Sequence, residues 1–188
     1  MNLPNILTII RLFLVPVFIL TYTAGDGAAV RVSAAAIFFI ASATDVLDGY
    51  IARKYNKITD FGKLADPVAD KLMQLSAVGC LAINKRISMW ILVLFIVKEV
   101  IMILGGINLL KEKFVVQSKW SGKIATVILF ACVMIILATD EQTLPEHYAT
   151  ILMCCSIVAT IIAFFDYAQM YIKIKENMAK SQANKEKK

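Results

Sequence analysis

The stretch from Asp45 to Asp70 reads D-V-L-D-G-Y-I-A-R-K-Y-N-K-I-T-D-F-G-K-L-A-D-P-V-A-D and joins two long apolar segments. Four of its carboxylates lie beside or inside those segments: Asp45, Asp48, Asp66 and Asp70. A carboxylate left unpaired at membrane depth is costly, so acidic groups in such segments indicate a functional site. Four of them together require a cation.

The composition around this stretch is that of a membrane protein. Apolar residue types make up 59% of the 188 residues, above the ~45–50% that is usual in soluble domains. The net charge of +6 comes from basic residues in short links and in the tail, a distribution that sets membrane topology, so we expect no nucleic-acid partner. The four cysteines lie in apolar runs and lack metal-ligand spacing. They are expected to pack or to face lipid.

Six apolar segments approach the ~20 residues that a bilayer crossing requires. We expect spans at about 6–22, 28–43, 61–83, 89–110, 120–138 and 147–172, the second continuing as helix through Arg53. The sequence therefore predicts an all-α fold, a polytopic integral membrane protein with six transmembrane helices. A polar lead-in around Pro4 and Asn5 predicts a short N-terminal interfacial segment. Residues 1–175 are expected to form a single membrane domain, and residues 176–188 a basic, disordered cytoplasmic tail.

The basic residues predict the orientation, because cytoplasmic links carry an excess of lysine and arginine. With both termini in the cytoplasm, fourteen basic residues lie inside: Arg53, Lys54, Lys57, Lys63, Lys111, Lys113, Lys119, Lys123, Lys173, Lys175, Lys180, Lys185, Lys187 and Lys188. Three lie outside: Arg31, Lys85 and Arg86. The aspartate-rich stretch is therefore expected at the cytoplasmic rim.

Helical periodicity places the aspartates on two faces. At about 100° per residue, Asp45 and Asp48 share one face of the second span with Gly49, Ala52 and Arg53. Asp66 and Asp70 recur at intervals of four from Gly62 on the third span. Two helices joined by a short link can thus present two carboxylates each toward one another. The small residues on these faces leave room for a ligand against the backbone.

Four converging carboxylates repel one another unless cations are bound. A donor set made only of oxygen suits Mg²⁺, Mn²⁺ or Ca²⁺ better than zinc. Two such ions can clamp phosphoryl oxygens during an in-line displacement, and a carboxylate can accept the proton of an attacking hydroxyl. The alternative is that the aspartates are helix caps and ion-pair partners, a role we assign to Asp60.

Further charged residues lie inside the apolar spans. Arg11 and Lys71 are functional candidates, because each lies near the cytoplasmic end of its span. Lys98 next to Glu99 fits an ion pair or a snorkelling side chain as well as a functional role. Asp166 fits a cavity lining or a structural hydrogen bond equally well.

The pattern D-x2-D-G-x2-A-R-x8-G-x3-D-x3-D, which residues 45–70 match without a departure, resembles the signature of the CDP-alcohol phosphatidyltransferase family. The resemblance implies a membrane enzyme with six spans, commonly a homodimer, that displaces CMP from a CDP-linked lipid with an alcohol. It implies Mg²⁺ or Mn²⁺, two ions per active site, held by Asp45, Asp48, Asp66 and Asp70. It also implies that Asp70 is the general base and that the CDP group lies against Asp48, Gly49, Ala52, Arg53 and Gly62.

Three other segments are similar to bacterial members of this family that use sn-glycerol 3-phosphate as acceptor: N-L-P-N-I-L-T-I-I-R from Asn2, F-G-K-L-A-D-P-V-A-D-K-L from Phe61 and S-K-W-S-G-K-I-A-T from Ser118. Similar enzymes often have Arg at the position of Lys98, and Lys is not equivalent in bidentate phosphate binding. The resemblance implies transfer of a phosphatidyl group from CDP-diacylglycerol to sn-glycerol 3-phosphate at a bacterial cell membrane.

Glycerol 3-phosphate is anionic, so its site needs basic and polar groups. The candidates for acceptor binding are Asn5, Thr8, Arg11, Lys119 and Lys123, although both lysines also fit a topology-setting role. Two alternatives stay open: the same family with serine, inositol phosphate or phosphatidylglycerol as acceptor, and a cation transporter that uses the aspartates as an ion site.

Overall fold

The residues that the structure describes form six α-helices and parts of the links between them. The structure is a computed structural model, which describes residues 3–25, 27–54, 60–111 and 120–186. Its helices are α1 (Leu3–Thr23), α2 (Ala28–Lys54), α3 (Asp60–Ile83), α4 (Met89–Lys111), α5 (Trp120–Ala138) and α6 (Glu146–Glu186). The described residues contain no strand. The predicted all-α fold is confirmed.

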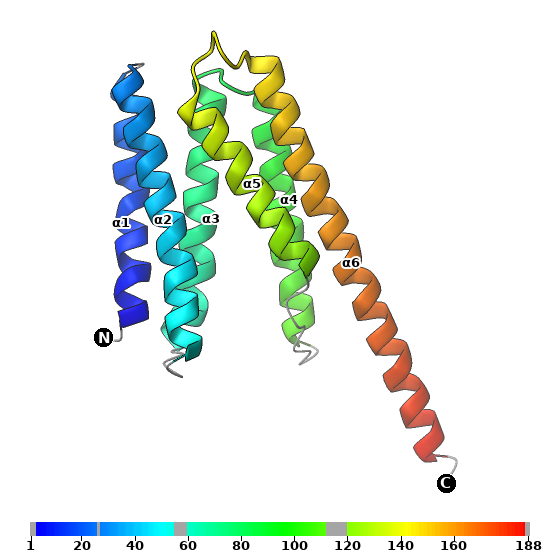
Figure 1. Ribbon diagram of the computed structural model, residues 1–188. Helices are drawn as coiled ribbons and strands as arrows, with labels where there is room; N and C mark the ends of the chain where they lie inside the picture. Colours follow the sequence, from blue (N-terminus) through cyan, green and yellow to red (C-terminus); the bar gives the residue numbers. More distant parts are fainter. Residues whose placement is uncertain (1–2, 26, 55–59, 112–119, 187–188) are drawn as a thin grey trace.

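The helices run alternately in opposite directions (Figure 1). The links after α1, α3 and α5 lie together at one end of the molecule. The start of α1, the end of α2 and the start of α3 lie at the other end, toward which α6 also runs. The link-facing ends of α2 and α3, which carry the aspartates, therefore share one end with the N-terminus.

Four helices are long and apolar enough to cross a membrane within the described residues. These spans are Asn5–Thr23, Ala28–Ile51, Trp120–Ala138 and Glu146–Asp166. Helix α3 carries Asp66, Asp70 and Lys71, and α4 carries Lys98 and Glu99. Such charges lower the apolar character of a segment. The four apolar helices are those of a membrane protein.

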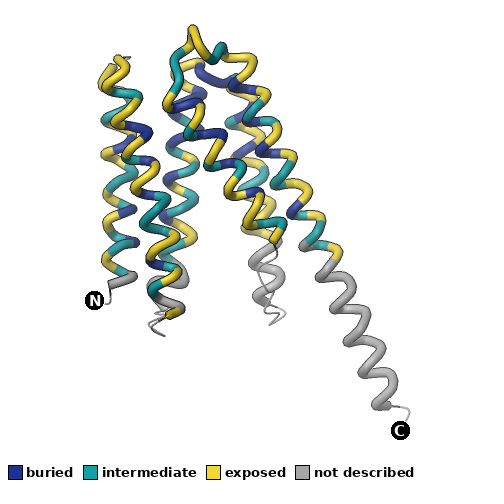
Figure 2. The backbone as a smooth tube through the Cα atoms, in the orientation of Figure 1, coloured by how far each residue is buried: buried dark blue, intermediate teal, exposed yellow. Residues whose placement is uncertain are grey.

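Buried residues recur along the helices that pack against one another (Figure 2). Helix α1 packs most extensively on α2 and α3, while α5 packs on α6 and α2. Phe38 of α2 lies between two aromatic neighbours, with ring centroids 6.2 Å from Phe18 of α1 and 5.7 Å from Phe130 of α5. Alanines at 34, 35 and 41 are buried on the same helix, and small residues allow neighbouring helices to approach closely.

Both ends of the chain differ from expectation. The polar lead-in is not a separate interfacial segment, because Leu3 to Thr23 form one continuous helix. Helix α6 continues to Glu186, where the sequence predicted a disordered tail from residue 176. That tail is rich in Lys, Glu, Ala, Met and Gln, which all favour helix. The division of the chain at residue 175 stays a prediction.

Candidate active site

The four aspartates of α2 and α3 lie close together at the end of the bundle that holds the N-terminus. Their charges interact within α2, between Asp45 and Asp48, and across the two helices, where Asp45 interacts with Asp66 and Asp70 and Asp48 interacts with Asp66. Asp48 is 2% exposed, whereas the other three are partly accessible. The helical spacing in the sequence thus corresponds to one shared cluster of carboxylates.

Helix α1 supplies the cationic partner of this cluster. The Arg11 guanidinium donates from Nη1 to Asp45 Oδ1 at 2.5 Å and from Nη2 to Asp48 Oδ2 at 2.5 Å. Arg11 is 1% exposed, and its Nε is buried without a hydrogen-bond partner. One turn earlier, the Thr8 hydroxyl donates to Asp66 Oδ1. Two predicted acceptor-binding residues therefore contact the predicted metal ligands.

The hydrogen-bond partner of Asp70 lies on the same helix, α3. Gln74 Nε2 donates to Asp70 Oδ2 at 2.8 Å, a pair four residues apart that shares one helix face. No hydrogen bond from α1 to Asp70 is present in the described part of the chain. In the described residues, the predicted general base therefore accepts from a neutral amide, whereas Asp45 and Asp48 accept from a guanidinium.

A chain of three charges links α3 to α4 beside Asp70. Glu99 accepts from Lys71 of α3 and, at 2.6 Å, from its neighbour Lys98. Lys98 Nζ also lies 4.2 Å from the centre of the Phe95 ring, a cation–π distance. The ion-pair interpretation of Lys98 is therefore found in the structure. The contact with Lys71 was missed, because Glu99 is 28 residues away and no sequence spacing relates the two.

The remaining predicted site residues have different positions. Gly49 is partly buried next to Asp48, and Asn5 is partly buried near the start of α1. Lys123 is exposed on α5, with Nζ 5.3 Å from the Trp120 ring centre. Lys119 lies outside the described residues, as do the surroundings of three residues within α2 and α3: Ala52, Arg53 and Gly62. Asp166 is partly buried on α6.

The donor set suits a hard divalent cation, because it consists of carboxylate oxygens without His or Cys. As the side chains stand, no three His, Cys, Asp or Glu residues of the described ranges are placed to share one ion. Each carboxylate accepts instead from a protein donor: Asp45 and Asp48 from Arg11, Asp66 from Thr8, and Asp70 from Gln74. The donor atoms of the four aspartates are thus of the kind that binds a hard divalent cation. In the structure, two of these aspartates, Asp45 and Asp48, are bonded to Arg11.

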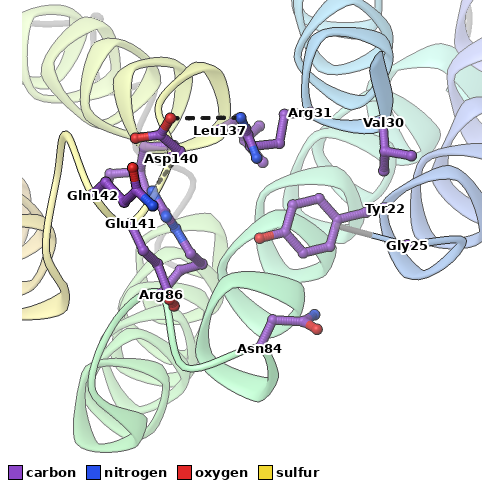
Figure 3. A pocket seen from close by; sticks show the side chains of 11 residues that line it. Tyr22, Gly25, Val30, Arg31, Asn84, Arg86, Leu137, Asp140, Glu141 and Gln142 are labelled. Atoms are coloured by element: carbon purple, nitrogen blue, oxygen red, sulfur yellow. Dashed lines mark hydrogen bonds and ion pairs between the residues drawn. The ribbon is translucent and has the colours of Figure 1, made fainter. Parts of the chain in front are cut away.

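A cavity of about 530 Å³ lies at the opposite end of the bundle, between the three links there (Figure 3). Its wall includes two arginines and two carboxylates: Arg31, Arg86, Asp140 and Glu141. Arg31 lies 3.8 Å from Asp140. Hydrogen bonds from Thr143, aided by the charges of Arg31 and Arg86, hold the pKa of Asp140 below its usual value. The charges of this cavity balance one another.

Arg86 ties two of those links together. Its guanidinium donates to the carbonyl of Thr139 at 2.8 Å and to that of Ile136 at 3.3 Å, at the end of α5. The preceding residue, Lys85, adopts the left-handed conformation (φ 56°), and the Arg86 N–H returns to the Leu81 carbonyl at 2.8 Å. This helix cap places Arg86 against α5. The role that follows from these contacts is structural.

Comparison with known proteins adds a family and several relatives. Residues 1–162 match the family described as CDP-alcohol phosphatidyltransferase. A "Probable phosphatidylglycerophosphate synthase" of Mycobacterium tuberculosis is 37% identical over 173 residues, covering 88% of this chain and 79% of the relative. A "CDP-diacylglycerol--glycerol-3-phosphate 3-phosphatidyltransferase" of Bacillus subtilis is 30% identical over 182 residues, covering 88% and 93%. One of the same name from Rickettsia bellii is 54% identical over 82 residues, covering 44% and 42%.

The matched region contains the whole candidate site. All four aspartates, their partners Thr8, Arg11 and Gln74, and the Lys71–Glu99 ion pair beside Asp70 fall within residues 1–162. Three of the four apolar spans lie wholly within it, and the fourth begins there.

Proposed function

The chain belongs to the CDP-alcohol phosphatidyltransferase family, and from this premise we propose that it transfers the phosphatidyl group of CDP-diacylglycerol to sn-glycerol 3-phosphate. The products are phosphatidylglycerol phosphate and CMP. The observation that carries the proposal is similarity along almost the whole chain to relatives named for this reaction. The carboxylate cluster on α2 and α3 supplies a site suited to the diphosphate.

The transfer makes one phosphorus–oxygen bond and breaks another. The primary hydroxyl oxygen of the acceptor attacks the phosphorus that carries diacylglycerol. The bond from that phosphorus to the oxygen shared with CMP breaks, and CMP leaves with the electron pair. We assign the hydroxyl proton to Asp70, since a carboxylate can act as general base and the Gln74 amide orients it through Oδ2.

Asp45, Asp48, Asp66 and Asp70 would hold Mg²⁺ or Mn²⁺, two ions per site. The ions would supply charge neutralisation to the diphosphate and to the leaving CMP. The oxygen-only donor set and the mutual proximity of the four carboxylates support this assignment. The aspartates' part is to fix the position of the diphosphate relative to Asp70.

The substrates are assigned to the residues around this cluster. Gly49, Ala52, Arg53 and Gly62, together with Asp48, would receive the CDP group along α2 and α3. Asn5, Thr8, Arg11, Lys119 and Lys123 are proposed for the acceptor. The positions of Thr8 and Arg11 next to the aspartates support them. The assignment of Lys119 and Lys123 to the acceptor is based only on the similarity of the segment that begins at Ser118.

The membrane arrangement that we propose has six crossings, including α3 and α4, with both termini and the active site in the cytoplasm. The alternation of helix direction supports it (Figure 1), and so does the basic bias of the links at the aspartate end. A cell-membrane enzyme of this arrangement meets CDP-diacylglycerol in the bilayer and its second substrate in the cytoplasm. We also propose that the protein forms a homodimer, on the basis of its resemblance to the family.

An acceptor panel tests the activity. Purified protein in mixed micelles with CDP-diacylglycerol and Mn²⁺ is given sn-glycerol 3-phosphate, serine, inositol phosphate or phosphatidylglycerol, and CMP and the new lipid are measured. We expect release of CMP with sn-glycerol 3-phosphate and formation of phosphatidylglycerol phosphate. If CMP is released only with another acceptor, that compound replaces sn-glycerol 3-phosphate as the proposed acceptor. If no acceptor leads to CMP release, the aspartates are better explained as an ion site than as the active site of an enzyme.

A further inference from the structure

The position of Arg11 raises a question that the proposed reaction does not answer. A guanidinium that is 1% exposed lies on two carboxylates assigned to metal binding, both at 2.5 Å. Its third nitrogen, Nε, is buried without a hydrogen-bond partner. An unsatisfied buried donor is unfavourable, so these contacts do not satisfy Arg11 completely. Arg11 is therefore held in place mainly by the charges of Asp45 and Asp48.

The charges around Arg11 explain why it is drawn there. The four carboxylates on α2 and α3 interact electrostatically. Neighbouring like charges repel one another, which destabilises the packing of these two helices. Arg11 is the one cation with an ion pair to any of them in the described part of the chain. Lys71 is paired with Glu99 instead. One guanidinium offsets part of the negative charge and leaves the rest for a further cation.

We propose that Arg11 is the resident counter-cation of the aspartate cluster and that it exchanges with the divalent metal, an inference that rests on the proposed function. Asp45 Oδ1 and Asp48 Oδ2 accept from Arg11, and the positive charge of the guanidinium next to these oxygens opposes the binding of a divalent cation. In this proposal, metal binding therefore displaces Arg11 from at least part of its contacts. Conversely, without a bound metal Arg11 adds two ion pairs to the packing of α1 on α2.

The exchange also connects metal loading with the acceptor. Arg11 is one helical turn from Thr8, and both side chains reach the cluster from α1. A guanidinium released from Asp45 and Asp48 stays at the edge of the site and suits a phosphate, which it can bind with two parallel hydrogen bonds. Arg11 thus becomes available to an anionic acceptor only after the metal has bound.

Thermal unfolding of Arg11→Gln in the full-length protein tests the exchange. In excess chelator we expect Tm to fall by roughly 10 °C relative to wild type, since removing one partner leaves buried carboxylates without a counter-charge. Saturating Mn²⁺ should remove most of that difference. Arg86→Gln is the matched control: it removes another buried arginine, 8% exposed and bonded to main-chain carbonyls. Its loss of Tm should be the same with and without Mn²⁺.

Mn²⁺ binding, measured by the electron spin resonance of the free ion, gives a second readout. Reciprocal competition predicts that Arg11→Gln binds Mn²⁺ about tenfold more tightly than wild type. If Arg11→Gln does not fold in chelator, the double variant Arg11→Gln with Asp48→Asn should fold better than the single variant, because the excess negative charge is reduced. Failure of that rescue would overturn the proposal.

The outcomes separate this inference from the proposed function. If wild type binds Mn²⁺ and Arg11→Gln is neither less stable in chelator nor tighter in Mn²⁺ binding, the exchange is wrong and the enzyme assignment stands. If wild type binds no Mn²⁺ and releases CMP at the full rate in chelator, the metal assignment fails and the exchange fails with it.

Discussion

Single residues hold the carboxylates of the site in three different ways. A guanidinium holds Asp45 and Asp48, a hydroxyl holds Asp66, and an amide of the same helix holds Asp70. A charged donor binds a carboxylate about twice as strongly as a neutral one. Asp70 is therefore less constrained than Asp45 or Asp48, which suits a group that must accept and release a proton.

The general-base role predicts the behaviour of Asp70→Asn. We expect turnover with CDP-diacylglycerol and sn-glycerol 3-phosphate to fall by about 10²–10⁴-fold, the usual contribution of general-base catalysis. Tm should change little, because an amide oxygen at position 70 can still accept from Gln74. Initial rates of CMP release measure the effect. Asp140→Asn, at the opposite end of the bundle, serves as control and should retain wild-type turnover; near-normal turnover of Asp70→Asn would remove the role.

The sequence alone identified the aspartates but not their partners. Spacing along α2 and α3 was sufficient for Asp45, Asp48, Asp66 and Asp70, because helical periodicity relates residues three or four apart. Arg11 is 34 residues from Asp45, and Thr8 is 58 residues from Asp66. Such contacts depend on how α1 crosses its neighbours, which no local pattern encodes. Arg11 was therefore assigned to the acceptor without its contacts to Asp45 and Asp48 being foreseen.

At the level of the elements, α2 is the central helix among those that carry the candidate site. It packs on α1, α3 and α5, and its buried alanines let these neighbours approach. Apart from the end of α6, the limits of the helices are close to those expected, because long apolar runs and polar links mark them in the sequence. The end of α6 was not predicted, since a polar, charged segment is compatible with either helix or disorder.

Close packing of α2 predicts that Ala34→Leu is destabilising. Ala34 is fully buried, and added methylenes in a well-packed region cost about 1–3 kcal/mol. We expect Tm in detergent to fall by several degrees, since about 2–4 °C corresponds to 1 kcal/mol for a chain of this size. Ala36→Leu, two residues away and exposed, is the control and should leave Tm unchanged. Equal Tm values for the two variants would show that α2 does not pack as described.

At the scale of the whole molecule, two polar regions lie at opposite ends of the bundle and differ in charge balance. The aspartate cluster has more carboxylates than cationic partners in the described residues, whereas the cavity around Arg31 and Arg86 pairs its arginines with Asp140 and backbone carbonyls. A site with excess negative charge can bind divalent cations, and such cations can in turn bind substrate phosphates. The balanced cavity instead stabilises the links at the end of the bundle opposite the aspartates.

The excess of basic residues at the aspartate end of the bundle predicts the orientation of the chain in a cell. In a variant whose four cysteines, Cys80, Cys132, Cys154 and Cys155, are replaced by alanine, one new cysteine is placed at Gln142, in the link between α5 and α6, or at Lys54, at the end of α2. Both positions are exposed, so each thiol can react where the reagent reaches it. In intact bacterial cells, a membrane-impermeant maleimide should label Gln142→Cys and not Lys54→Cys.

Permeabilisation is the control for this labelling, because both variants should then react to the same extent. The physical reason for the expected difference is the excess of basic residues on the side of Lys54, which retains that side in the cytoplasm. The opposite pattern would place the aspartate site outside the cell, away from a cytoplasmic acceptor. Labelling of both positions in intact cells would mean that α2 and α5 do not separate their ends across the membrane, and the six-crossing arrangement would have to be abandoned.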